Sequence, residues 1–133
     1  MDQPFISIVT VCFNAASVLE GTIQSVISQT CRDIEYIVID GASKDDTLNI
    51  IEEYSPHISK WITETDKGIY DAMNKGIRLA SGKFIWFLNA GDRAFNNRVV
   101  ERLKAISEDS ELLYGEVMIV DDHRKHLLSL IHI

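Results

Sequence analysis

The stretch Phe84-Ile85-Trp86-Phe87-Leu88-Asn89-Ala90-Gly91-Asp92 decides the fold that we predict for this chain. Its first five residues are all apolar, which favours a strand covered on both faces, as in a parallel sheet, because a half-exposed strand would alternate apolar and polar residues. Ligands of open α/β sheets lie beyond the carboxyl ends of the strands, where Asn89, Gly91 and Asp92 follow. Gly91 allows a ligand or metal to approach the backbone closely, and Asp92 offers an oxygen ligand. The alternative is an ordinary polar turn, since all three residue types are common in turns.

Strand-like and helix-like patterns alternate along the rest of the chain. Apolar runs predict strands over residues 6–11, 34–39, 58–63 and 112–120. Helical spacing predicts helices over residues 17–30, from 45 or 46 to just before Pro56, 68–80 and 97–107. Ser17 and Glu20 fit a capping box for the first helix, and Ile69, Ala72, Met73, Ile77 and Ala80 mark one apolar face of the third. This alternation predicts an α/β fold, a mainly parallel sheet with helices on both faces.

Length, composition and charge restrict the function. A chain of 133 residues with 46% hydrophobic residues is the size of one globular domain. The formal net charge of -7 argues against nucleic-acid binding, and it makes an anionic substrate hard to hold without a divalent cation. Cys12 and Cys31 have no metal-ligand spacing and are predicted to be free thiols. The sequence lacks a signal-peptide pattern and a membrane-length apolar run, so we expect a cytoplasmic location.

The last six residues stand apart from the rest. Residues 128–133 match the translation of a common sequencing-library adapter, so we interpret them as a non-native tail; the alternative is a short final strand. The predicted domain then covers residues 1–127 and is incomplete at its C-terminus.

Three polar clusters follow the predicted strands: Asp40 with the loop 41–47, Glu64 with Asp66, and Asn89 with Asp92. The carboxyl ends of parallel strands meet at one edge of a sheet, so these clusters are expected to line one cleft. Asp40 either stabilises a turn or accepts hydrogen bonds from a nucleotide base or ribose. Lys67 and the amides of the following helical turn could counter a diphosphate, although a solvated helix face explains the same residues. Neither a P-loop nor a G-x-G-x-x-G fingerprint is present.

Four motifs taken together, residues 6–14, 40–47, 66–76 and 87–92, resemble the family 2 glycosyltransferases of the GT-A fold. The resemblance extends over about residues 5 to 120. It implies that the donor-binding residues are Thr10, Asn14, Asp40, Asp66, Lys67, Gly68, Asn74, Asn89, Gly91 and Asp92. It also implies a divalent cation, Mg²⁺ or Mn²⁺, on the donor's diphosphate. The chain departs from the family's D-x-D motif at Asn89, so the cation would rest mainly on Asp92.

The resemblance implies inverting transfer of a sugar from a nucleotide-diphosphate donor to a saccharide or lipid-linked acceptor in cell-surface polysaccharide biosynthesis. It places the catalytic base in a second half beyond this chain, so this chain is expected to bind the donor and to be poorly active alone. Peripheral membrane association of the full-length parent is compatible with this reading. One alternative is a sugar nucleotidyltransferase, although the glycine-rich basic loop it needs is absent from residues 12–16. The other is a non-catalytic nucleotide-binding or interaction domain.

Overall fold

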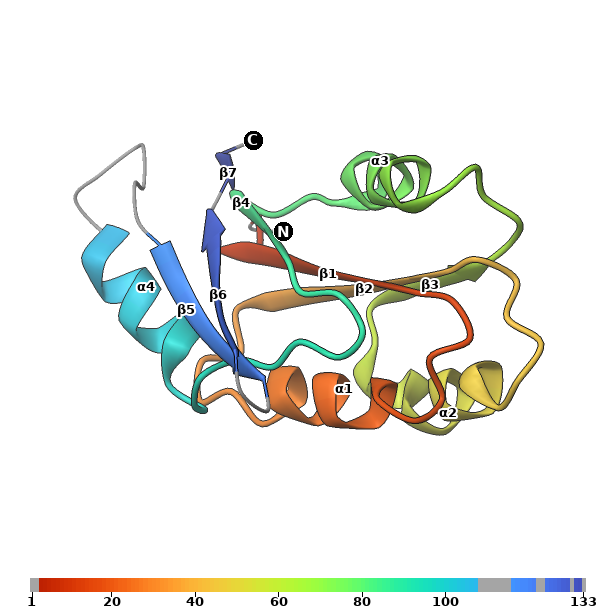
Figure 1. Ribbon diagram of the computed structural model, residues 1–133. Coiled ribbons are helices and arrows are strands. Elements are labelled where there is room, and N and C mark those ends of the chain that lie inside the picture. The colour runs from red at the N-terminus through yellow and green to blue at the C-terminus, as the bar shows by residue number, and fades with distance from the viewer. Residues whose placement is uncertain (1–2, 108–115, 122–123, 130, 133) are drawn as a thin grey trace.

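The computed structural model describes residues 3–107, 116–121, 124–129 and 131–132 of the chain (Figure 1). Strands and helices alternate through its first part, as the sequence predicts. The strands of this part are β1 (Ile6–Cys12), β2 (Ile34–Asp40), β3 (Lys60–Thr63) and β4 (Phe84–Phe87). The helices are α1 (Leu19–Ile27), α2 (Thr47–Tyr54), the short 3-10 helix η1 (Ser55–His57), α3 (Ile69–Leu79) and α4 (Val99–Ser107).

The main sheet has the strand order β3-β2-β1-β4-β7, and its first four strands are parallel. Ile6 of β1 lies level with Ile34 of β2 and with Phe84 of β4. The carboxyl ends of these strands therefore meet at one edge, where the predicted polar clusters follow them. The predicted parallel sheet is confirmed.

Helices cover both faces of this sheet (Figure 1). α1 and α2 lie on one face, and α4 adds Val99 and Val100 to the same core. α3 lies alone on the opposite face, over a smaller core that contains Val9, Ile37 and Ile85. Trp86, at the centre of the deciding stretch, is fully buried.

α3 contacts the sheet through a different face from the one that we predicted. Ala72 and Gly76 are buried, whereas Ile69 is 50% exposed and Ile77 is 43% exposed. A Cβ atom on Gly76 would lie only 2.5 Å from Cγ1 of Val9, so the helix lies too close to β1 for a larger side chain. The prediction that Ile69 and Ile77 belong to the buried face was wrong, because close backbone packing selects the small residues instead.

The predicted capping box at the start of the first helix is also wrong. α1 begins at Leu19 with Val18 as its N-cap, and no side chain caps it. The Glu20 carboxylate accepts a hydrogen bond from the Tyr54 hydroxyl at 2.8 Å, so it joins α1 to α2.

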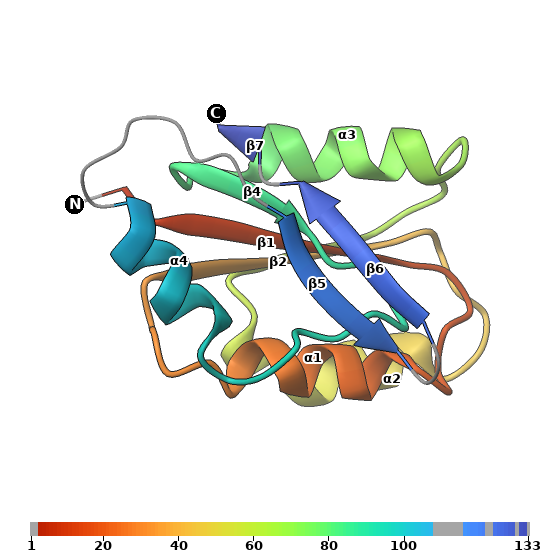
Figure 2. The same cartoon turned by 60° about the vertical axis from the view of Figure 1, so that its left-hand side comes forward.

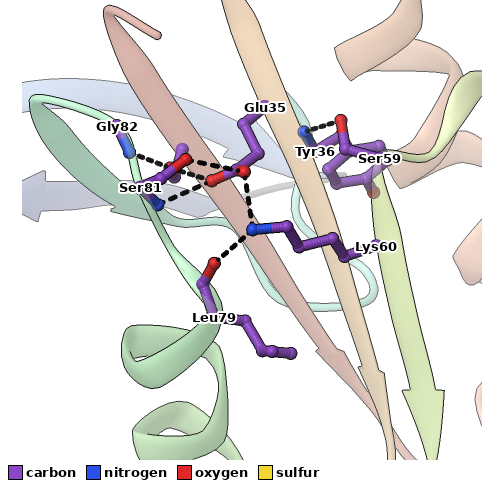
Figure 3. Close-up of polar contacts among 8 residues, drawn as sticks. Glu35, Tyr36, Ser59, Lys60, Leu79, Ser81 and Gly82 are labelled. Atoms are coloured by element: carbon purple, nitrogen blue, oxygen red, sulfur yellow. Dashed lines mark hydrogen bonds and ion pairs between the residues drawn. The ribbon is translucent and has the colours of Figure 1, made fainter. Parts of the chain in front are cut away.

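A buried carboxylate fixes the opposite edge of the sheet, at the amino ends of the strands (Figure 3). Glu35 Oε1 accepts hydrogen bonds from the Ser7 hydroxyl at 2.7 Å and the Ser81 N–H at 2.8 Å. Its Oε2 accepts one from the Ser81 hydroxyl at 2.9 Å and lies 3.0 Å from the Lys60 ammonium group. Lys60 also donates to the Leu79 carbonyl at the end of α3. This network holds the turn between α3 and β4 against β1, β2 and β3.

The last described strands lie beside β4 (Figures 1 and 2). β5 (Glu116–Asp121) and β6 (Arg124–Ser129) form an antiparallel hairpin, and β7 (Ile131–His132) pairs antiparallel with β4. Residues 112–115 of the predicted last strand lie outside the described residues. The interpretation of residues 128–133 as a non-native tail remains a prediction.

Candidate functional site

The loops that follow β1 and β2 are joined to each other by hydrogen bonds. The Asn14 N–H donates to the Ser43 hydroxyl at 2.7 Å, and the Lys44 N–H donates to Asn14 Oδ1 at 2.9 Å. Asn14 and Ala42 both have a positive φ, 48° and 63°. This conformation is uncommon outside glycine, so the paired loops are held in a specific shape. Asn14 therefore shapes the edge of the sheet.

Asp40 is fully buried at the end of β2. Its Oδ1 accepts a hydrogen bond from the Ser43 hydroxyl at 2.5 Å and a weak one from the Cys12 thiol at 3.6 Å. Its Oδ2 accepts from the Ser43 N–H at 3.0 Å and the Thr63 hydroxyl at 2.7 Å. The carboxylate therefore organises the loop from inside. Burial and the neighbouring Asp40 charge raise the pKa of the Cys12 thiol far above its usual range, so this thiol stays protonated.

Asp66 lies directly beside this loop. A Cβ atom on Gly41 would be 2.7 Å from Asp66 Oδ2, so the Asp66 carboxylate packs directly against the Gly41 backbone. Asp66 Oδ1 accepts a hydrogen bond from the Gly68 N–H at 3.0 Å, and the Lys67 N–H donates to Asp71 Oδ2 at 2.9 Å. Gly68 has φ 114°, and a Cβ atom on it would meet nothing within 4 Å. The start of α3 thus presents open backbone next to the Asp66 carboxylate.

The residues after β4 form the third part of the site. Gly91 has φ 100°, and its N–H donates to the Thr22 hydroxyl of α1 at 2.9 Å. The Asp92 N–H donates to the Asn89 carbonyl at 2.9 Å, which closes a tight turn. Asn89 Oδ1 is buried and has no hydrogen-bond partner among the residues that the structure describes. A buried acceptor without a donor is costly, so this oxygen is a candidate contact for a ligand.

These three parts surround a cleft of about 340 Å³ at the carboxyl edge of the sheet. Its lining residues come from the ends of β1 and β4 and from the start of α3: Val11, Cys12, Phe13, Ala15, Asp66, Gly68, Ile69, Asn89 and Ala90. A smaller cavity of about 100 Å³ lies elsewhere, between residues of α1, β2 and η1.

The structure places the predicted site residues differently. Asp66, Gly68 and Asn89 line the cleft, while Asn14, Gly91 and Asp92 lie in the loops around it and Asp40 is buried at the end of β2. Thr10 is fully buried within the sheet: its hydroxyl donates to the Leu88 carbonyl at 2.7 Å and lies 2.8 Å from the Tyr36 hydroxyl. Lys67, just before α3, and Asn74, in the middle of α3, are exposed.

Sequence reasoning missed Phe13. Its side chain lines the cleft, is 62% exposed, and lies 3.3 Å from where a Gly41 Cβ atom would be. The sequence did contain a signal, since Phe13 is an aromatic residue directly after the apolar run of the first strand. We counted it as the end of that buried run.

Across the described ranges, no three acidic, histidine or cysteine side chains lie close enough together to hold a metal ion. The predicted cation ligand, Asp92, follows β4 at this edge, and its carboxylate oxygens are ligands that Mg²⁺ and Mn²⁺ prefer.

Comparison with known proteins decides the family. Residues 7–131 match the family described as Glycosyl transferase family 2. The chain belongs to this family. The predicted family resemblance is thereby confirmed, and the fold agrees with it.

Two solved glycosyltransferase structures share the fold of this family 2 chain. TarS of Staphylococcus aureus (residues 1–349, in complex with UDP-GlcNAc) is 21% identical with a TM-score of 0.73; the match covers 78% of this chain and 31% of TarS. The mannosyltransferase PcManGT of Pyrobaculum calidifontis, in complex with GDP-Man and Mn²⁺, is 20% identical with a TM-score of 0.72; the match covers 83% of this chain and 34% of that protein.

A curated relative is closer in sequence. The PGL/p-HBAD biosynthesis glycosyltransferase of Mycobacterium tuberculosis is 37% identical over 124 residues, which are 89% of this chain and 48% of the relative. The family 2 chain thus spans about half the length of this relative. No helix within the described residues is long and apolar enough to cross a membrane.

Proposed function

We propose that this chain is the donor-binding half of an inverting family 2 glycosyltransferase, and that its cleft binds a nucleotide-diphosphate sugar. The cleft between the ends of β1 and β4 and the start of α3 carries this proposal. It combines the acidic side chain of Asp66, open backbone at Gly68 and the unpartnered oxygen of Asn89. The base and ribose of a nucleotide carry hydrogen-bond donors for the oxygens of Asp66 and Asn89. Its phosphates could lie in the open space beside the Gly68 backbone.

The base is proposed to lie against Phe13. An exposed aromatic ring beside a carboxylate gives a flat stacking surface with an acceptor at its edge, and stacking on an aromatic side chain contributes about 1–3 kcal/mol per base. The exposure of Phe13 and the position of Asp66 next to Gly41 support this placement. A buried Asp40 then acts by holding the loop under the base, and direct contact of Asp40 with the base remains a prediction.

Asn89 and Asp92 are proposed to hold the ribose and the divalent cation. The Asn89 side-chain oxygen has no protein partner among the described residues, so it fits a ribose hydroxyl or a hard cation. Asp92 follows in the same turn and supplies the negative charge that Asn89 lacks. When bound, the cation would stabilise the charge of the departing diphosphate. The predicted cation is Mg²⁺ or Mn²⁺, and PcManGT was solved with Mn²⁺.

Sugar transfer itself is proposed for the whole protein. The curated relative is a glycosyltransferase named for PGL/p-HBAD biosynthesis, which supports a biosynthetic role. A saccharide or lipid-linked acceptor in cell-surface polysaccharide biosynthesis remains a prediction. The catalytic base and the cytoplasmic location remain predictions. Membership of family 2 argues against the nucleotidyltransferase alternative.

Isothermal titration of the 133-residue chain with UDP, GDP and dTDP, each with and without Mn²⁺, tests the proposal. We expect heat of binding with at least one nucleotide when Mn²⁺ is present. Asn89→Ala should weaken that binding about tenfold, because it removes one buried hydrogen bond of about 1.4 kcal/mol. Glu52→Gln, an exposed change on α2, is the matched control and should leave the affinity unchanged. No heat with any of the three nucleotides would overturn donor binding.

A further inference from the structure

Lys75 is the most enclosed lysine that the structure pairs with carboxylates. Its side chain is only 11% exposed, although lysine normally keeps its charge in water. The ammonium group donates to the Thr65 carbonyl at 3.0 Å. It lies 3.1 Å from Glu64 Oε1 and 3.9 Å from Asp71 Oδ2. One largely enclosed cation therefore joins the middle of α3 to the segment that leads from β3 into α3.

This segment carries Asp66 and Gly68, which lie just before α3 and line the cleft. The contacts continue directly to them. Asp71 Oδ2, next to the Lys75 ammonium group, accepts the Lys67 N–H, and Asp66 Oδ1 accepts the Gly68 N–H. Thr65, whose carbonyl Lys75 holds, is the immediate neighbour of Asp66 in sequence. Lys75 thus fixes the backbone on both sides of the Asp66 carboxylate.

An ordinary surface ion pair does not explain this arrangement. The Glu64 side chain is 58% exposed, so its pairing with Lys75 is screened by water and contributes little to stability. The hydrogen bond to the Thr65 carbonyl is different, because it fixes main-chain geometry. Gly68, with φ 114°, has more allowed backbone conformations than any other residue type, so an anchor close to it restricts the segment.

We propose that Lys75 is a positioning residue for donor binding: it holds the 64–68 segment so that Asp66 and Gly68 face the cleft. This inference rests on the proposed function, since the donor is what Asp66 and Gly68 are placed to meet. Lys75 itself does not line the cleft, so it acts through the segment that it holds.

The test compares Lys75→Met, Lys75→Arg and the control Arg78→Met in the 133-residue chain. Met keeps the length of the side chain and removes the charge, while Arg keeps the charge and the ability to donate to Thr65. Arg78 is an exposed cation on the same helix. Each variant is measured for nucleotide affinity with Mn²⁺, for melting temperature, and for hydrogen exchange at the Lys67 and Gly68 amides.

We expect Lys75→Met to bind nucleotide about tenfold more weakly, in the range known for groups that orient a binding residue. Its Lys67 and Gly68 amides should exchange faster than those of the wild-type chain, while amides of β1 and β2 keep their protection. Lys75→Arg should recover part of the affinity, and Arg78→Met should match the wild type. In an Asp66→Asn background, Lys75→Met should reduce nucleotide affinity much less, because both substitutions act on the same contact with the nucleotide.

The two proposals fail in different ways. If the wild-type chain binds no nucleotide, the proposed function falls, and the inference falls with it. If the wild type binds and Lys75→Met binds equally well, only the positioning role is overturned. A Lys75→Met variant that loses affinity together with protection throughout the sheet also overturns it, since Lys75 would then support the whole fold.

Discussion

The Asp40 carboxylate accepts two hydrogen bonds from Ser43, one from Thr63 and a weak one from Cys12, so all of its nearest donors belong to the protein. These donors come from the end of β1, the loop after β2 and the end of β3. The negative charge therefore holds together three backbone segments at the carboxyl edge of the sheet, and one of them, the end of β1, lines the cleft. Its first role is to keep these segments in place.

Asp40→Asn should accordingly destabilise the chain even without ligand. An asparagine replaces one acceptor oxygen with an NH₂ group, which faces the donors from Ser43 or Thr63 and leaves one unsatisfied, at a cost of about 1–3 kcal/mol. The melting temperature should fall by several degrees. Thermal unfolding followed by circular dichroism measures this, with Glu52→Gln as the control. An unchanged melting temperature would show that the Asp40 contacts are not needed for the loop.

Single residues could be placed from the sequence only where one strand end determined them. Asp66 and Asn89 line the cleft because each follows a strand of the parallel sheet closely. Thr10 lies three residues before Phe13, and its hydroxyl is hydrogen-bonded to the Leu88 carbonyl and the Tyr36 hydroxyl inside the sheet. Phe13, and not Thr10, therefore lines the cleft. The neighbouring strands decide which side chains reach the cleft, and the pattern of a single strand does not contain that information.

At the scale of elements, α3 is anchored near both ends by charged and polar contacts. Lys75 and its partners fix the start, and Glu35, Lys60 and Ser81 fix the turn after the end (Figure 3). The helix lies against β1 through Ala72 and Gly76, with few large side chains in the contact. Polar anchors at the ends therefore supplement a thin apolar contact in the middle.

Glu35 makes stability depend on pH. Burial opposes its ionisation, but the hydrogen bonds from the Ser81 N–H, Ser7, Lys60 and the Ser81 hydroxyl outweigh burial and hold the pKa of Glu35 below its ordinary value of 4.5. A lowered pKa in the folded state means that ionised Glu35 stabilises the fold above about pH 4.5, and that this contribution is lost as the pH falls through the folded-state pKa.

Glu35→Gln should therefore lower stability by about 1–3 kcal/mol at pH 7, and this loss should shrink as the pH falls below 4.5 and through the folded-state pKa of Glu35. The Lys60 part of this loss should be small, because the Lys60 side chain is 43% exposed and its charge is screened. Urea unfolding between pH 3 and 7 measures the difference between variant and wild type. A difference that does not shrink toward low pH would show that ionised Glu35 is not the source of the stabilisation.

The order and type of elements followed from the sequence, and their exact contacts did not. Strand and helix periods are local, so the parallel sheet and the helices on both faces could be predicted. The face of α3 was not, because apolar spacing marked Ile69 and Ile77 while the approach of β1 required Gly76. The Glu20 capping box failed for the same reason: Tyr54, on another helix, binds its carboxylate.

At the scale of the whole molecule, a net charge of -7 sets a condition on the proposed donor. Asp40, Glu64, Asp66 and Asp92 all lie at the edge of the sheet where the cleft opens, so a diphosphate placed there meets repulsion. Lys75 is already paired with two carboxylates, and Lys67 is exposed. The repulsion from these carboxylates is therefore what a divalent cation bound with the donor would offset.

Divalent cations should therefore decide whether the phosphates help or hinder binding. With Mn²⁺, UDP should bind at least tenfold more tightly than uridine; with EDTA, this advantage should disappear, because the diphosphate then meets only the acidic edge. Asp92→Asn should remove most of the Mn²⁺ effect on UDP and leave uridine binding unchanged, whereas Glu52→Gln should alter neither. Titration of both ligands under both conditions measures the four affinities. Equal UDP affinity with Mn²⁺ and with EDTA would mean that the protein holds the diphosphate without a cation, and Asp92 would then lose its proposed role.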